Sequence, residues 1–103
     1  MELRHLHYFL ALAERLSFTQ AAEQVHVTQS TLSHQIRQLE DELGQRLFDR
    51  VGKKVVITEA GELFLPSMTK VLREIEAGLR ILRGSRDRRP DPNAGSGTAL
   101  EAR

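Results

Sequence analysis

Ser30, His34 and Asp41 are residue types that can serve as a nucleophile, a base and an orienting acid. At about 100° per residue, all three fall on one side of a helix. His34 and Asp41 are separated along such a helix by about 10 Å, at a rise of about 1.5 Å per residue. A hydrogen bond within a catalytic triad needs about 3 Å, so the spacing excludes a triad here.

Metal and thiol chemistry are also disfavoured. The chain has no cysteine, which excludes thiol nucleophiles and Cys-ligated zinc. His5 and His7 differ by about 200° around a helix, so they cannot readily share an ion, and no other group of ligands is apparent. We therefore expect no enzymatic activity, no metal site and no cofactor.

The segment around Ser30 and His34 suits hydrogen bonding to the base edges of DNA. Gln can pair with adenine and Arg with guanine, and each such contact discriminates by about 1–3 kcal/mol. The carboxylates of Glu40, Asp41 and Glu42 come only in the C-terminal half of the segment. The N-terminal half supplies the candidate base-reading residues, which are Gln29, Ser30, Thr31, Ser33, His34 and Arg37. An ordinary solvated helix face is the alternative, and the surrounding elements must decide between the two.

The apolar pattern predicts that this segment is a helix. Leu32, Ile36, Leu39 and Leu43 fall on one stripe, opposite the polar face. Thr28 is an N-cap candidate before the helix, and Gly44 is a natural C′ residue after it.

Two further helices are predicted upstream. Apolar residues recur at steps of three and four over residues 2–16, as in an amphipathic helix. Ser17 offers a cap with Gln20 at the capping-box spacing, and a short helix follows over residues 18–25. A helix, a short turn and a second helix are the parts of a helix-turn-helix.

A small hairpin is predicted downstream of the polar helix. Residues 46–50 and 55–58 are short β-prone runs around the link 51–54, whose tip is basic. The predicted fold class is therefore mainly α, a winged helix-turn-helix of three helices and a two-stranded wing. In this arrangement the polar helix enters the DNA major groove. The short helix and the basic hairpin favour this interpretation over a solvated face.

Phosphate contacts would position such a reading helix. Backbone N–H groups at the N-termini of two helices can bind phosphate, and basic side chains in the hairpin can add charge. The candidate phosphate contacts are Ser17, Phe18, Thr28, Arg50, Lys53 and Lys54, with Arg46 a weaker candidate.

A long helix is predicted over residues 59–83, capped by Thr58 and continuing through Pro66. Its apolar residues are spaced 3, 4, 3, 4, 3, which is the a/d seam of a coiled coil. The predicted dimer interface is Leu65, Met68, Leu72, Ile75, Leu79 and Leu82. The alternative is a helix that packs on its own domain, with Phe64 and Val71 turned to the core. Residues 84–103 contain two prolines and no periodicity, and we expect a flexible tail.

The length, net charge and apolar runs of the chain limit the classes of protein to which it can belong. The 103 residues carry a net charge of +1, which is modest for a domain that coats DNA without sequence preference. No apolar run approaches the roughly 20 residues that span a bilayer, and the N-terminus lacks the layout of a signal peptide. We expect a soluble protein of the cytoplasm with no membrane partner.

The central segment closely resembles the N-terminal part of LysR-type transcriptional regulators. The matching motifs are Ser17, Ala21-Ala22, Thr28-Gln29, Ser33 to Ile36, Leu39-Glu40, Leu43-Gly44 and Leu47 to Arg50. The later ITEAG, residues 57–61, is similar to the start of that family's linker helix. The resemblance covers about residues 2–83. It departs at Val25, where the family usually has Leu, and at Ser30, where Pro is frequent.

The resemblance implies a winged helix-turn-helix over about residues 1–58, with the helix-turn-helix proper near residues 18–37. It also implies a long linker helix that pairs two subunits. It also implies binding of double-stranded DNA at partly palindromic promoter sites, as a homodimer or, in full-length proteins, a dimer of dimers. Family members usually respond to a small co-inducer, but we expect no co-inducer site within these 103 residues.

Two other classes compete with this interpretation. A protein-interaction module would dimerise through the heptad helix and show no sequence preference for DNA. A nonspecific DNA-coating protein would lose its binding steeply with salt and ignore sequence.

Overall fold

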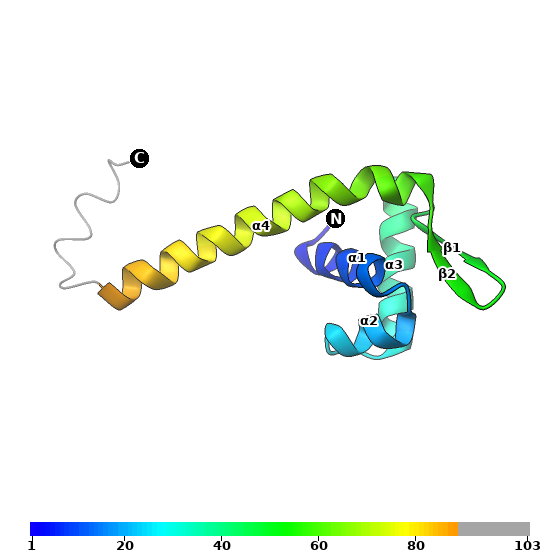
Figure 1. Cartoon of the computed structure of the whole chain (residues 1–103), viewed down its shortest axis with the longest axis horizontal. Helices are drawn as coiled ribbons and strands as arrows, with labels where there is room; N and C mark the ends of the chain where they lie inside the picture. The colour runs from blue at the N-terminus through cyan, green and yellow to red at the C-terminus, as the bar shows by residue number, and fades with distance from the viewer. Residues whose placement is uncertain (89–103) are drawn as a thin grey trace. The chain divides into compact units, whose positions relative to one another are not determined.

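Local rules set the boundaries of the elements. The computed structural model describes residues 1–88, so residues 89–103 of the expected tail lie outside it. The chain divides into two units, residues 1–72 and residues 73–103. The elements in order are α1 (Leu3–Arg15), α2 (Phe18–Gln24), α3 (Gln29–Leu43), β1 (Phe48–Val51), β2 (Lys54–Ile57) and α4 (Glu59–Arg88) (Figure 1). The predicted winged helix-turn-helix order is confirmed.

The predicted helix caps are present. In each case the cap hydroxyl accepts a hydrogen bond from the backbone N–H three residues on, at 3.1 Å for Ser17, 3.1 Å for Thr28 and 3.0 Å for Thr58. Gly44 ends α3 in the left-handed region, with φ of 71°. Each cap satisfies a backbone group that the helix end would otherwise leave unpaired.

The hairpin is tighter than predicted. The antiparallel pairing of β1 and β2 places Val51 opposite Lys54, so the loop holds two residues rather than four. Gly52 has a φ of 65°, the left-handed value that a two-residue hairpin loop needs at its first position. Glycine adopts this conformation without steric cost, which lets the strands extend to Val51 and Lys54.

The core of the first unit joins α1, α2 and α3 to the base of the hairpin. The largest fully buried side chains are Phe9, Leu12, Leu32, Leu39 and Leu47. Aromatic contacts centre on one of them, because the Phe9 ring lies 5.6 Å from the ring of Phe48 and 5.2 Å from that of Phe64. Such edge-to-face and tilted pairs add to the gain from burial.

The apolar stripe of α3 is buried over three of its four predicted members. Leu32, Ile36 and Leu39 lie in the core, whereas Leu43 is 36% exposed. Leu43 is the last residue of α3, where the chain turns away through Gly44. The stripe therefore fixes the orientation of the helix and leaves the opposite, polar face outward.

The first two of the six residues in the predicted dimer seam pack on the chain's own core. Leu65 and Met68 are partly buried against that core, together with Phe64. Val71, which the alternative interpretation turned to the core, is 42% exposed. Further along α4 the seam residues Leu79 and Leu82 are 45% and 66% exposed, so the unpartnered part of the seam lies toward the C-terminal end of the helix.

The long helix extends beyond its predicted end. It passes through Pro66 and continues to Arg88, so residues 84–88 are helical rather than part of a tail. Gly84 alone costs a helix only about 1 kcal/mol, which does not stop it.

Candidate nucleic-acid interface

The first turns of α3 carry the predicted base-reading residues on an outward face. Gln29, Thr31, His34 and Arg37 are exposed, as is Ser30. Ser33 is half-buried and lines a cleft beside the helix. The structure therefore gathers all six candidates on one helix, with no carboxylate among them.

Hydroxyl groups at the start of α3 are linked to one another. The Thr28 hydroxyl lies 2.9 Å from that of Thr31 and 3.3 Å from that of Ser30. Gln29 is held from the neighbouring helix, because its Oε1 accepts from the Thr19 hydroxyl at 3.4 Å. This contact leaves the amide N–H donors of Gln29 available for a ligand.

The hairpin supplies unengaged positive charge. Arg50, Lys53 and Lys54 are all exposed, and no ion pair within residues 1–88 involves them. Lys53 lies in the two-residue loop at the tip, and Lys54 begins β2. A cationic hairpin beside an outward polar helix is the geometry in which backbone phosphates are bound while bases are read.

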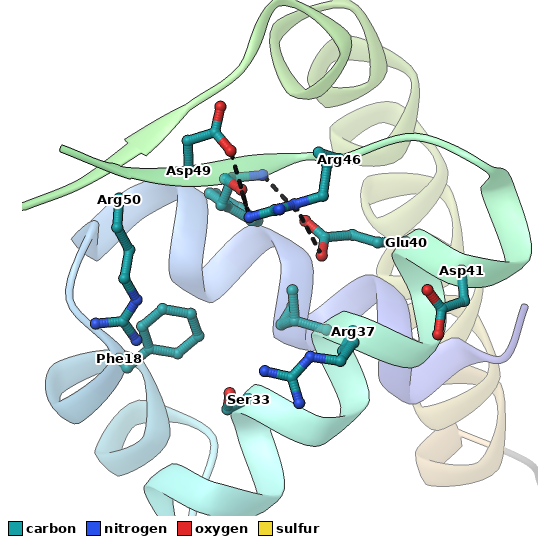
Figure 2. Close-up of a pocket in the computed structure, with 10 residues that line it drawn as sticks. Phe18, Ser33, Arg37, Glu40, Asp41, Arg46, Asp49 and Arg50 are labelled. Atoms are coloured by element: carbon teal, nitrogen blue, oxygen red, sulfur yellow. Dashed lines mark hydrogen bonds and ion pairs between the residues drawn. The ribbon is translucent and has the colours of Figure 1, made fainter.

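Arg46 differs from these residues, because its charge is used within the chain. Its guanidinium lies 3.7 Å from a carboxylate oxygen of Glu40 and 3.3 Å from one of Asp49 (Figure 2). It also donates to the backbone carbonyl of Phe48 at 3.0 Å. These three contacts make Arg46 a weaker candidate for phosphate binding than Arg50.

Glu40 is the centre of this network. Its carboxylate accepts hydrogen bonds from the backbone N–H groups of Leu47 at 2.8 Å and Phe48 at 3.1 Å. The side chain is only 11% exposed, although it belongs to α3. Glu40 thus connects the start of β1 to α3, and its carboxylate lines the cleft beside that helix.

The other two acids of α3 are arranged differently. Glu42 pairs with the N-terminal ammonium of Met1, and this hydrogen bond, with the attraction of the positive charge, lowers the pKa of its carboxyl group. Asp41 lines the cleft and is exposed. Two of the three carboxylates of α3 are therefore occupied within the chain.

A cleft of about 330 Å³ separates α3 from β1. Ser33 and Arg37 contribute from α3, Phe18 from the start of α2, and Arg50 from β1 (Figure 2). The guanidinium of Arg50 lies over the Phe18 ring, at 4.9 Å from its centroid. Arg37 forms no hydrogen bond or ion pair with any side chain in the described part of the molecule. The cleft also contains Arg46 and the carboxylates of Glu40, Asp41 and Asp49. Arg37 and Arg50 are its two guanidinium groups outside any ion pair within residues 1–88, and a guanidinium can bind anionic oxygens.

Comparison with known proteins decides which class this geometry belongs to. The family described as "Bacterial regulatory helix-turn-helix protein, lysR family" matches residues 3–62, more than half of the chain. The chain belongs to this family. The match covers α1 to α3, the wing and the first turn of α4.

Curated relatives of this LysR-family chain are regulators. It is 49% identical over 87 residues to the RuBisCO operon transcriptional regulator of Allochromatium vinosum, a match covering 82% of this chain and 29% of the relative. It is 50% identical over 76 residues to the DNA-binding transcriptional dual regulator OxyR of Escherichia coli K12, covering 74% of this chain and 25% of OxyR. The chain thus spans less than a third of the length of the curated relatives it matches.

Solved structures with the same fold include DNA complexes. The DNA-binding domain of BenM in complex with catB site 1 DNA is 40% identical, with a TM-score of 0.76 over 81% of this chain and 93% of that one. The CbnR DNA-binding domain bound to DNA is 33% identical, with a TM-score of 0.74 over 82% and 98%. These similarities confirm the winged helix-turn-helix fold of this LysR-family chain.

Two features of the interface escaped sequence reasoning. Glu40 was assigned only to the acidic half of the helix, whereas its carboxylate binds the backbone at the start of β1. Phe18 was considered for its position at a helix N-terminus, whereas its ring contacts Arg50. Both contacts join residues far apart in the chain, and no local sequence pattern predicts them.

Residues 1–88 contain neither a candidate metal site nor a membrane-spanning helix. No group of three or more His, Cys, Asp or Glu side chains there could hold a metal ion. None of the helices in that range is long and apolar enough to cross a membrane.

Proposed function

We propose that this chain is the sequence-specific DNA-binding portion of a LysR-type transcriptional regulator, which binds a partly palindromic promoter site as a dimer. The observation that carries the proposal is the N-terminal half of the outward face of α3, where six polar side chains lie beside a cationic hairpin and no carboxylate is among them. In a helix-turn-helix this face of the second helix lies in the major groove. The related BenM and CbnR domains, described as DNA complexes, support the same use of the fold.

Within this proposal the candidates divide into two roles. Gln29, His34 and Arg37 have side chains long enough to reach base edges, with Ser30, Thr31 and Ser33 beside them. Ser17, Phe18, Thr28, Arg50, Lys53 and Lys54 contact the phosphate backbone. A cytoplasmic location and, in a full-length protein, assembly beyond the dimer follow from the same proposal.

The division of roles is tested with Arg37→Ala and Lys53→Ala. The test uses a duplex enriched by selection from a random pool and a scrambled duplex of equal composition. Arg37→Ala is expected to lower discrimination between the two by about 1–3 kcal/mol, because a base contact is lost. Lys53→Ala is expected to weaken both duplexes alike and to reduce the salt slope of binding by about 1. Fluorescence anisotropy titrations at several salt concentrations measure both quantities.

The two variants control for each other, since both remove one positive charge from the same surface. Equal losses on cognate and scrambled DNA for both would contradict the assignment of Arg37 to base reading.

A further inference from the structure

An aromatic ring and a guanidinium from distant parts of the chain meet at the mouth of the cleft. Phe18 is the first residue of α2, and Arg50 lies on β1 (Figure 2). The guanidinium carbon is 4.9 Å from the ring centroid, within the roughly 6 Å at which a cation is attracted to an aromatic face. Phe18 itself is half-buried and packs against the core, so the ring is a fixed platform.

The ring holds Arg50 without using its hydrogen-bond donors. A carboxylate partner, as at Arg46, occupies N–H groups of the guanidinium. Stacking on a ring occupies only the face, so the edge of the Arg50 fork remains available for two parallel bonds to a phosphate. Asp49, the neighbouring acid, is paired with Arg46 and does not compete for Arg50 within residues 1–88.

We propose that Phe18 is a positioning residue for recognition of the DNA backbone, its ring holding the Arg50 guanidinium ready to bind one phosphate. The inference rests on the proposed function and adds to it one contribution to the affinity for DNA. An exposed arginine loses rotamer freedom when it binds. An arginine already held in its bound position loses less, and the affinity gains by the difference.

A purely structural role of Phe18 predicts different behaviour. Loss of core packing would lower the stability of the domain, and any effect on binding would then be the same whether or not Arg50 is present. A positioning role acts only through Arg50, so the effect on binding must vanish when Arg50 is replaced. This difference is the basis of the test.

The experiment is a double-mutant cycle with the full chain. Phe18→Leu, Arg50→Gln and the double variant are titrated by fluorescence anisotropy against an enriched duplex of about 30 base pairs, roughly three helical turns, and a scrambled duplex of equal composition. Phe18→Leu is expected to weaken both duplexes about two- to fivefold. In the Arg50→Gln background the same substitution is expected to change neither dissociation constant.

Phe18→Tyr keeps an aromatic face under Arg50, so the binding lost in Phe18→Leu is expected to be restored in this conservative variant. Urea unfolding of each variant shows that binding is measured on folded protein. Equal losses from Phe18→Leu in both Arg50 backgrounds, or a loss in Phe18→Tyr as large as in Phe18→Leu, would overturn the inference. Failure of the unmodified chain to bind either duplex would instead overturn the proposed function.

Discussion

At the scale of the single residue, the carboxylate of Glu40 stabilises the fold, although Glu40 belongs to the proposed DNA-reading helix. Glu40 lies three residues after Arg37, yet it accepts two backbone hydrogen bonds from the start of β1 and is largely shielded from solvent. Hydrogen bonds to a charged group are stronger than neutral ones. Glu40 therefore satisfies two backbone donors, and its negative charge lies close to the guanidinium of Arg46.

We expect Glu40→Ala to lower the free energy of unfolding by about 1–3 kcal/mol, because two backbone N–H groups lose their acceptor. Asp41→Ala is the matched control, since the Asp41 side chain is exposed and its loss should change stability by less than about 0.5 kcal/mol. Urea denaturation followed by circular dichroism gives both values. Equally small changes in the free energy of unfolding for the two variants would show that the hydrogen bonds of Glu40 contribute nothing to stability.

The base-reading candidates could be predicted at this scale, whereas the internal contacts could not. Gln29, His34 and Arg37 follow from a helical period that turns them away from the apolar stripe. The partners of Glu40 and Phe18 depend on how β1 is placed beside α3 and α2. That placement is a tertiary property, and the spacing of residues along the chain does not contain it.

At the scale of the element, short-range rules account for most boundaries. The hydroxyl caps Ser17, Thr28 and Thr58 begin three helices, and Gly44 ends one. The wing loop and the end of α4 were placed wrongly by a few residues. Gly52 allows a tighter loop than the four-residue link that was predicted, and Gly84 does not end the helix as predicted.

The junction of wing and linker helix depends on a glycine for a different reason. A Cβ at Gly61 would lie 2.5 Å from the backbone carbonyl oxygen of Leu47 and 2.5 Å from Cγ1 of Ile57. Real side chains do not approach so closely, so one element must shift. Thr58 reinforces the same contact, because its hydroxyl donates to the carbonyl of Arg46 at 2.6 Å.

Gly61→Ala is accordingly expected to lower the free energy of unfolding by about 1–3 kcal/mol through overpacking. Gly78→Ala, also on α4, is the matched control because its added Cβ meets nothing within 4 Å. It should leave the urea midpoint unchanged or raise it slightly, since alanine favours a helix over glycine. A midpoint for Gly61→Ala equal to that of the unmodified chain would contradict close packing at this junction.

At the scale of the whole molecule, the apolar residues of α4 have two uses. Leu65 and Met68 pack on the core of the first unit, whereas Leu79 and Leu82 are exposed. The heptad spacing predicted a single seam, because spacing alone does not distinguish a neighbour in the same chain from one in a partner. We propose that pairing of two chains begins near Leu72 and uses the later part of the seam.

We expect Leu72→Glu and Leu79→Glu together to give monomers, because each places a charge in an apolar seam. Leu63→Glu with Ile81→Glu is the matched control, since both residues are 73% exposed and lie outside the seam. Sedimentation equilibrium distinguishes the two states. If the variant with both seam substitutions is still a dimer, this helix is not part of the interface.

The central claim is that the outward face of α3 selects DNA by sequence. The measurement that tests it most directly is selection of bound duplexes from a random pool at about 0.15 M salt, where unselective phosphate contacts are weakened. We predict enrichment of an inverted repeat whose half-sites are one or more helical turns apart, as two-fold symmetry requires. Retention of duplexes without any enriched sequence, or no retention at all, would contradict it.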